Sequence, residues 1–118
     1  MHRILIVDNN QVYADAAASL LRLLGHDVRT AYDGLSAVQI AQEFKPDAAF
    51  LDLVMPGMDG VELAEALRAL DCMKGAKIFA LTAFNNKASS QAVRAAGFDA
   101  IVAKPATADD LAKALDRK

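Results

Sequence analysis

Five short apolar runs alternate with longer segments of helical periodicity along this chain. The segments between the runs place apolar side chains every three or four residues, as amphipathic helices do. Such alternation indicates βα units and a parallel sheet covered by helices. We therefore expect an α/β fold with five βα units. The predicted strands cover residues 3–7, 27–31, 47–51, 78–81 and 99–103.

The first predicted helix follows Asn10, a plausible N-cap, and ends at Gly25, which suits a C-cap. Its apolar face is predicted to carry Val12, Ala16, Leu20 and Leu23. The later helices are expected at 34–44, 60–70 and 86–96 and from Thr107 onward. Their predicted inward residues are Ala37, Ile40, Ala41, Phe44, Leu63, Leu67, Leu70, Ala88, Ala92, Ala95, Ala96, Leu111 and Leu115.

Composition fits one domain spanning residues 1–118. A chain of 118 residues with 54% hydrophobic content can bury one core but has little room for a second. The net charge is −2, and Lys and Arg are scattered, so direct nucleic-acid binding is not expected. Cys72 is the single cysteine, which excludes an internal disulfide. Because no apolar stretch reaches about 18 residues and no signal peptide is recognisable, we expect a cytoplasmic chain without membrane contact.

Four of the apolar runs lead into polar side chains that can take part in chemistry. Asp8, Asp52, Thr82 and Lys104 each follow a predicted strand directly. Right-handed crossovers make the strands parallel, so their C-terminal ends share one edge of the sheet. Open α/β sheets bind ligands at that edge. The four side chains are therefore expected to meet in one site.

The motifs at these strand ends are similar to those of a known family. They are Ile4-Leu5-Ile6-Val7-Asp8, Ala31-Tyr32-Asp33-Gly34, Leu51-Asp52 through Met55-Pro56-Gly57-Met58-Asp59-Gly60, Leu81-Thr82-Ala83, Ala96-Gly97-Phe98-Asp99-Ala100 and Lys104-Pro105. In this order and spacing, the chain resembles the receiver domain of two-component response regulators from Ile4 to about Leu115. The resemblance implies a doubly wound, CheY-like (flavodoxin-like) sheet with strand order 2-1-3-4-5.

The resemblance also implies a chemistry for the predicted site. Asp52 would accept a phosphoryl group from a phosphohistidine on a histidine kinase or a histidine phosphotransfer protein. Asp8, Asp52 and the backbone carbonyl of Val54 would hold Mg²⁺, a hard cation that prefers oxygen ligands. Lys104 would contact the phosphoryl oxygens, and Thr82 would donate its hydroxyl to the new phosphate.

The resemblance further implies a signalling domain that catalyses only its own phosphorylation and dephosphorylation. Its output surface would be formed by the fourth helix, fifth strand and fifth helix, which would bind a downstream protein or an output domain. The sequence leaves open whether the chain is a stand-alone regulator or a domain of a larger protein such as a hybrid histidine kinase.

Two positions depart from the family pattern. Asn9 stands where the family has a second acid, and it is either a weaker amide ligand of Mg²⁺ or a helix cap beside Asn10. Ile101 stands three residues before Lys104, where many members have an aromatic ring that moves on activation. Ile101 is expected to be buried, so Phe84 is the alternative group that shapes access to the phosphoryl group.

Three other functions make different demands on the same residues. A flavin or nucleotide domain of this fold would have a glycine- or hydroxyl-rich loop after the first strand, but Asp8-Asn9-Asn10 has neither. An Asp-x-Asp phosphatase is excluded because residue 54 is Val. The alternative that stays open is a pseudo-receiver, a phosphorylation-independent protein-interaction module, which Asn9 and Ile101 favour and Asp52, Thr82 and Lys104 oppose.

Overall fold

The computed structural model describes residues 2–53, 57–82, 95, 97–103 and 107–115. The predicted helix at 86–96 falls outside these residues, apart from residue 95. The elements are β1 (Arg3–Val7), α1 (Gln11–Leu23), β2 (Asp27–Ala31), α2 (Gly34–Phe44), β3 (Ala48–Asp52), α3 (Gly60–Arg68), the 3-10 helix η1 (Asp71–Met73), β4 (Lys77–Thr82), β5 (Ala100–Ala103) and α5 (Ala108–Leu115).

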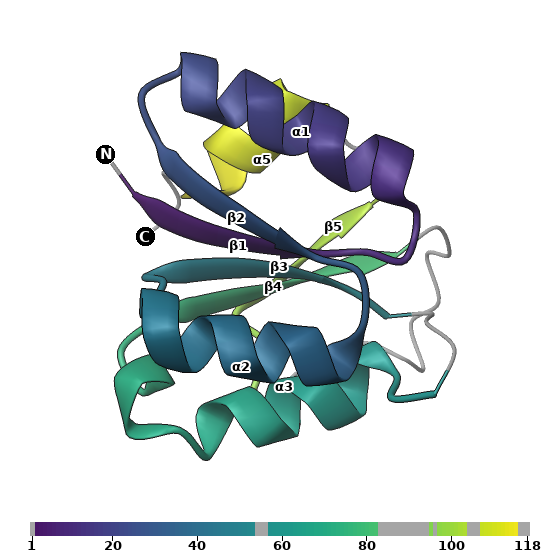
Figure 1. Ribbon diagram of the computed structural model, residues 1–118, viewed down its shortest axis with the longest axis vertical. Coiled ribbons are helices and arrows are strands. Elements are labelled where there is room, and N and C mark those ends of the chain that lie inside the picture. Colours follow the sequence, from purple (N-terminus) through teal and green to yellow (C-terminus); the bar gives the residue numbers. More distant parts are fainter. Residues whose placement is uncertain (1, 54–56, 83–94, 96, 104–106, 116–118) are drawn as a thin grey trace.

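The five strands form one parallel sheet in the order β2-β1-β3-β4-β5. Figure 1 shows α1 and α5 on one face of this sheet and α2 and α3 on the other. The strand order and the helices on both faces confirm the predicted doubly wound α/β fold.

The core has two layers, because each strand alternates its side chains between the two faces of the sheet. In β1, Ile4 and Ile6 pack toward α1 and α5, whereas Leu5 and Val7 pack toward α2 and α3. Phe50 and Phe79 stack in the first layer with ring centroids 4.9 Å apart. Burial on both faces explains why the strands are continuous apolar runs and not alternating ones.

Local signals set the ends of the helices. The Asn10 side chain accepts a hydrogen bond from the Tyr13 backbone N–H at 3.1 Å and caps α1. Gly25 follows α1 with a φ of +98°, a conformation that glycine adopts without strain. Asp59 caps α3, which ends at Arg68, two residues earlier than predicted, and η1 follows.

The predicted apolar face of α1 is wrong. Val12 and Leu23 are each 82% exposed, and Leu20 is 50% exposed. The buried residues are Ala14, Ala17, Ala18 and Leu21. Large side chains of the sheet, among them Phe50 and Phe79, already fill this layer, so the helix packs with small residues against them. In α2 the prediction is confirmed for Ala37, Ala41 and Phe44, while Ile40 is only half-buried.

Candidate functional site

Asp8 and Asp52 lie side by side at the C-terminal edge of the sheet. In the β1–β3 register, Val7 is paired with Leu51. Asp8 follows Val7 and Asp52 follows Leu51 in the sequence, so the two acids are neighbours across the two strands. Asp8 is fully buried and Asp52 is 6% exposed. They are the buried charged residues among those that the structure describes. Burying two carboxylates costs free energy, which points to a function at this edge.

Backbone groups fix the position of Asp8. Its N–H donates to the Ala31 carbonyl at 3.1 Å, which continues the β1–β2 pairing by one residue. Its Oδ1 accepts a hydrogen bond from the Asn10 backbone N–H at 2.9 Å. The start of α1 therefore orients the carboxylate of Asp8.

The turn after Asp52 is held close to the sheet. The Leu53 N–H donates to the Leu81 carbonyl at 3.0 Å, and the Gly60 N–H donates to the Leu53 carbonyl at 3.2 Å. A Cβ on Gly60 would lie 2.6 Å from the Asp52 carbonyl oxygen, so only glycine allows this approach. The start of α3 thus supports the backbone that carries Asp52.

The backbone places Thr82 at the same edge. Asp52 is paired with Leu81 and Thr82 with Ala103, so β3, β4 and β5 end close together. Thr82 is the last residue of β4 rather than the residue after it. Lys104 and Val54, which were predicted to complete the site, lie outside the described residues.

Asn9 is exposed next to buried Asp8. Its predicted alternative role as a helix cap is wrong, because Asn10 is the N-cap of α1. Asn9 therefore follows Asp8 at the C-terminal edge of the sheet without being the N-cap of α1. Ile101 also differs from expectation: it is 36% exposed, because it lies on β5, the edge strand of the sheet.

Tyr13 is a residue of the site that the sequence interpretation missed. It lies in the first turn of α1 and packs partly against the core layer beneath α1 and α5. Burial, followed by the negative charges of Asp8, Asp110 and Asp52, raises its pKa to about 12. The phenol therefore lies within the electrostatic influence of both site carboxylates. Its position three residues after the Asn10 cap is the only sequence signal that points to this placement.

The donor groups suit a hard divalent cation. Two carboxylates and the nearby amide of Asn9 are all oxygen ligands, which Mg²⁺ prefers over nitrogen and sulfur. Within the part of the chain that the structure describes, no group of three or more His, Cys, Asp or Glu side chains could hold a metal ion.

Comparison with known proteins identifies the family. The model of the response regulator receiver domain matches residues 4–116, and this chain belongs to that family. Its members are signalling domains of two-component systems. Over 72 residues the chain is 49% identical to the transcriptional regulatory protein PrrA of Mycobacterium tuberculosis, covering 58% of this chain and 30% of PrrA. The chain thus spans less than a third of the length of that relative.

Three further similarities cover most of the chain. The polar-differentiation response regulator DivK of Brucella anthropi is 28% identical over 102 residues, which are 86% of this chain and 83% of DivK. The solved structure of the Vibrio cholerae chemotaxis protein CheY4 is 31% identical, with a TM-score of 0.95 over 99% of this chain and 98% of CheY4. A Burkholderia pseudomallei response regulator, solved with a phosphorylated aspartic acid, a calcium ion and citrate, is 28% identical, with a TM-score of 0.90 over 98% of this chain and 67% of that one.

Among the described helices, none has the length and apolar character needed to cross a membrane.

Proposed function

We propose that this receiver domain accepts a phosphoryl group on Asp52 from a phosphohistidine of a histidine kinase or a histidine phosphotransfer protein. The observation that carries the proposal is the position of Asp52, at the C-terminal end of the central strand β3 and beside fully buried Asp8. The Burkholderia relative, whose structure holds a phosphorylated aspartic acid, supports the same chemistry.

The transfer is a displacement at phosphorus. A carboxylate oxygen of Asp52 forms a bond to phosphorus while the bond from phosphorus to the imidazole nitrogen breaks. The electron pair of that bond goes to the imidazole, which takes up one proton from solvent. The product is an acyl phosphate on Asp52. The fixed backbone around Leu53 and Gly60 keeps the carboxylate in position for this attack.

An anionic nucleophile must approach an anionic phosphoryl group, so positive charge is required at the site. We infer that Asp8, Asp52 and the carbonyl of Val54 hold Mg²⁺, with Asn9 as a further, weaker ligand. Bound there, the cation supplies charge neutralisation. Asp8, oriented by the Asn10 N–H, holds its carboxylate toward the same edge as Asp52.

We assign the remaining roles to Lys104 and Thr82. Lys104 follows the end of β5 and would bring an ammonium group to the phosphoryl oxygens, while Thr82 at the end of β4 would donate its hydroxyl to the phosphate. The contact with Thr82 would couple phosphorylation to the segment that follows β4.

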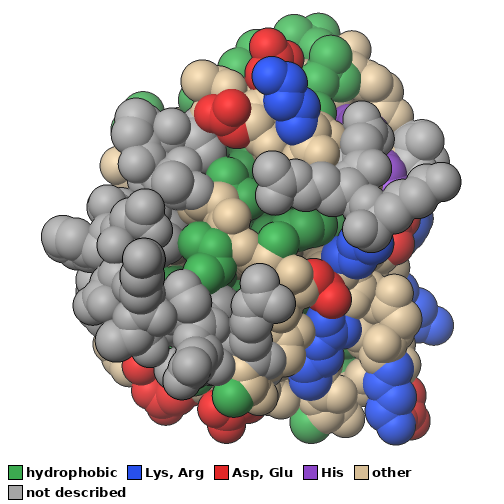
Figure 2. All heavy atoms as spheres, turned by 180° about the vertical axis from the view of Figure 1, so that it is seen from behind, with side chains coloured by type: hydrophobic (Ala, Val, Ile, Leu, Met, Phe, Trp, Pro, Cys, Tyr) green, Lys and Arg blue, Asp and Glu red, His purple; other side chains and the backbone are tan. Residues whose placement is uncertain are grey.

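The output partner is proposed to be a protein that binds the face formed by the predicted helix at 86–96, β5 and α5. Figure 2 shows one face of the molecule, on which the described basic side chains lie among acidic ones instead of forming one continuous area. The net charge of −2 supports a protein partner over direct binding to nucleic acid.

The decisive experiment is intact mass spectrometry after incubation with a small-molecule phosphodonor, with and without Mg²⁺. We expect a Mg²⁺-dependent gain of one phosphoryl group in the native chain and in Asp71→Asn, whose side chain is 96% exposed. Asp52→Ala should gain none. If the native chain gains no mass even at high Mg²⁺, the phosphoacceptor function is rejected, and the domain acts as a pseudo-receiver that only binds partners.

A further inference from the structure

The most exposed apolar surface among the described helices lies on α1. Val12, Ala16, Leu20 and Leu23 follow one another at intervals of four, four and three residues, and all of them are exposed. We call these four residues the α1 stripe. It extends over about 17 Å, the rise of eleven helical residues. Exposed apolar stripes of this length mark interaction surfaces in soluble domains.

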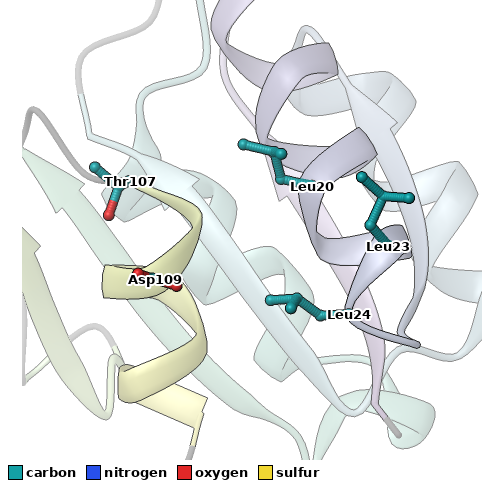
Figure 3. Close-up of a pocket in the computed structure, with 5 residues that line it drawn as sticks. All are labelled: Leu20, Leu23, Leu24, Thr107 and Asp109. Atoms are coloured by element: carbon teal, nitrogen blue, oxygen red, sulfur yellow. The ribbon is translucent and has the colours of Figure 1, made fainter.

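The α1 stripe continues into a hollow at its C-terminal end. Leu20, Leu23 and Leu24 line one side, and Thr107 and Asp109 from the start of α5 line the other (Figure 3). The hollow has a volume of about 370 Å³. Leu24 is 56% exposed, so the apolar surface reaches from the helix into this hollow.

The distribution of side-chain size on α1 is nearly symmetric about its centre. Small exposed residues, Ala16 and Ser19, lie in the middle, and Val12 and Leu23 lie at the two ends. If a second α1 packs antiparallel about an axis between Ala16 and Ser19, Val12 of each copy meets Leu23 of the other. Small central residues allow the two helix axes to approach closely.

Charge follows the same symmetry. Asp15 and Arg22, seven residues apart, lie on one flank of the stripe, on either side of the axis between Ala16 and Ser19, and both are exposed. In an antiparallel pair, the same flank of each helix faces its counterpart. With the axis between Ala16 and Ser19, Asp15 of one copy lies about 3 Å along the helix axis from the level of Arg22 of the other, within reach of the long arginine side chain, twice per pair.

We propose that the α1 stripe is a two-fold, antiparallel interface with a second copy of this chain. The interface is self-complementary in both apolar shape and charge, as a two-fold dimer requires. It is smaller than the roughly 800 Å² per partner that stable complexes bury, so association depends on concentration. The proposal is independent of the phosphorylation chemistry of Asp52.

Sedimentation velocity from about 1 µM to 1 mM tests the interface, a range that includes weak dimers. The native chain should become dimeric with rising concentration. Leu23→Asp should weaken the dimer at least about tenfold, because a desolvated carboxylate would lie in the interface. The matched control is Leu35→Asp: Leu35 is 73% exposed on α2, across the sheet, and its variant should dimerise as the native chain does.

A pair of charge variants tests the antiparallel geometry. Asp15→Arg alone places two arginines opposite each other, and Arg22→Asp alone places two aspartates opposite each other, so each variant should dimerise less than the native chain. Mixed in equal amounts, they restore both opposite-charge pairs and should form a heterodimer. Asp15 also accepts a hydrogen bond from the Tyr32 hydroxyl, and Arg22 donates one to the Val28 carbonyl, so circular dichroism must first establish that both variants are folded.

Two outcomes would overturn the proposal. One is a native chain that stays monomeric at about 1 mM, and the other is a mixture of the charge variants that associates no better than either alone. A monomeric native chain whose phosphorylation by a histidine phosphotransfer protein is slowed by Leu23→Asp would assign the α1 stripe to the phosphodonor instead.

Discussion

In the proposed cation site, Asn9 is the residue expected to set the strength of Mg²⁺ binding. It follows buried Asp8 and is exposed at the edge of the sheet where Asp52 lies. Because divalent cations bind more tightly as anionic oxygen ligands are added, we expect Asn9→Asp to lower the Kd for Mg²⁺ about tenfold. Phosphorylation of Asp52 should also be faster when Mg²⁺ is subsaturating. Isothermal titration calorimetry measures the first effect and intact mass spectrometry the second.

Asn10→Asp is the matched control for this change. It adds the same charge one residue further along, and aspartate caps a helix as well as asparagine does. Its effect on the Kd should be smaller, because the side chain at position 10 is engaged with the Tyr13 N–H. An Asn9→Asp variant with the Kd of the native chain would remove Asn9 from the site.

Tyr13 reports the charge of the site. Its pKa is raised to about 12, first by burial and then by Asp8, Asp110 and Asp52. The pKa of tyrosine in an unfolded chain is about 10. Because the folded state holds the proton of Tyr13 more tightly, the neutral phenol contributes to the free energy of unfolding, and this contribution is fully present below about pH 10. The contribution is lost as the pH rises from about 10 through about 12. Asp52→Asn removes one of the negative charges and should therefore lower the pKa of Tyr13.

Ultraviolet absorbance of tyrosinate as a function of pH measures this pKa. The chain has two tyrosines, Tyr13 and Tyr32, so Tyr13→Phe retains Tyr32 alone. The titration of the native chain minus that of Tyr13→Phe therefore gives the titration of Tyr13. An unchanged Tyr13 titration in Asp52→Asn would separate the phenol electrostatically from Asp52 and contradict the arrangement described above.

At the scale of elements, the contact between β3 and α3 holds Asp52, the proposed phosphoacceptor, in place. A Cβ on Gly60 would lie 2.6 Å from the Asp52 carbonyl oxygen and 2.7 Å from Leu53 Cα. These are backbone atoms, which cannot rotate away, so the end of β3 or the start of α3 must shift. We expect Gly60→Ala to lower the free energy of unfolding by about 2 kcal/mol and to slow phosphorylation of Asp52.

Gly75→Ala serves as the control, because a Cβ there meets no atom within 4 Å and its φ is not positive. Urea unfolding gives the free energies of both variants, and intact mass spectrometry gives the phosphorylation rates. Equal stability of Gly60→Ala and Gly75→Ala would mean that the close approach of α3 does not support the site.

Strand positions and caps were predictable from sequence because each depends on local chemistry. The runs in β1 and β3 are buried on both faces, and the Asn10 and Gly25 signals act on neighbouring backbone groups. The face of α1 was not predictable in this way. Two apolar stripes compete on this helix, and the smaller one is buried because Phe50 and Phe79 already occupy the volume beneath it.

For the whole molecule, topology explains which parts of the site were predictable. Parallel strands bring Asp8, Asp52 and Thr82 to one edge whatever the side-chain packing, so strand ends alone predict their convergence. The approach of Tyr13 to the acids depends on how α1 is rotated on the sheet. That rotation follows from the packing of the complete core, which periodicity in the sequence does not specify.

The stability of the whole domain should reflect the charges that the site buries. Asp8 and Asp52 place like charges side by side at one sheet edge, where water screens them little. Replacing one with a neutral amide of similar shape relieves this repulsion. In a domain of this size, about 1 kcal/mol corresponds to a change of roughly 4 °C in Tm. We therefore expect Asp52→Asn to raise the Tm of the metal-free protein by about this amount.

Mg²⁺ should stabilise the native chain more than it stabilises Asp52→Asn. A ligand that binds only the folded state stabilises it by mass action, so Mg²⁺ should raise the Tm of the native chain. It should raise the Tm of Asp52→Asn much less, because that variant has lost an anionic ligand. Differential scanning calorimetry in EDTA and in Mg²⁺ measures both effects, with exposed Asp71→Asn expected to follow the native chain. Equal Mg²⁺-induced shifts in all three proteins would place the cation elsewhere, because the proposed site includes the carboxylate of Asp52.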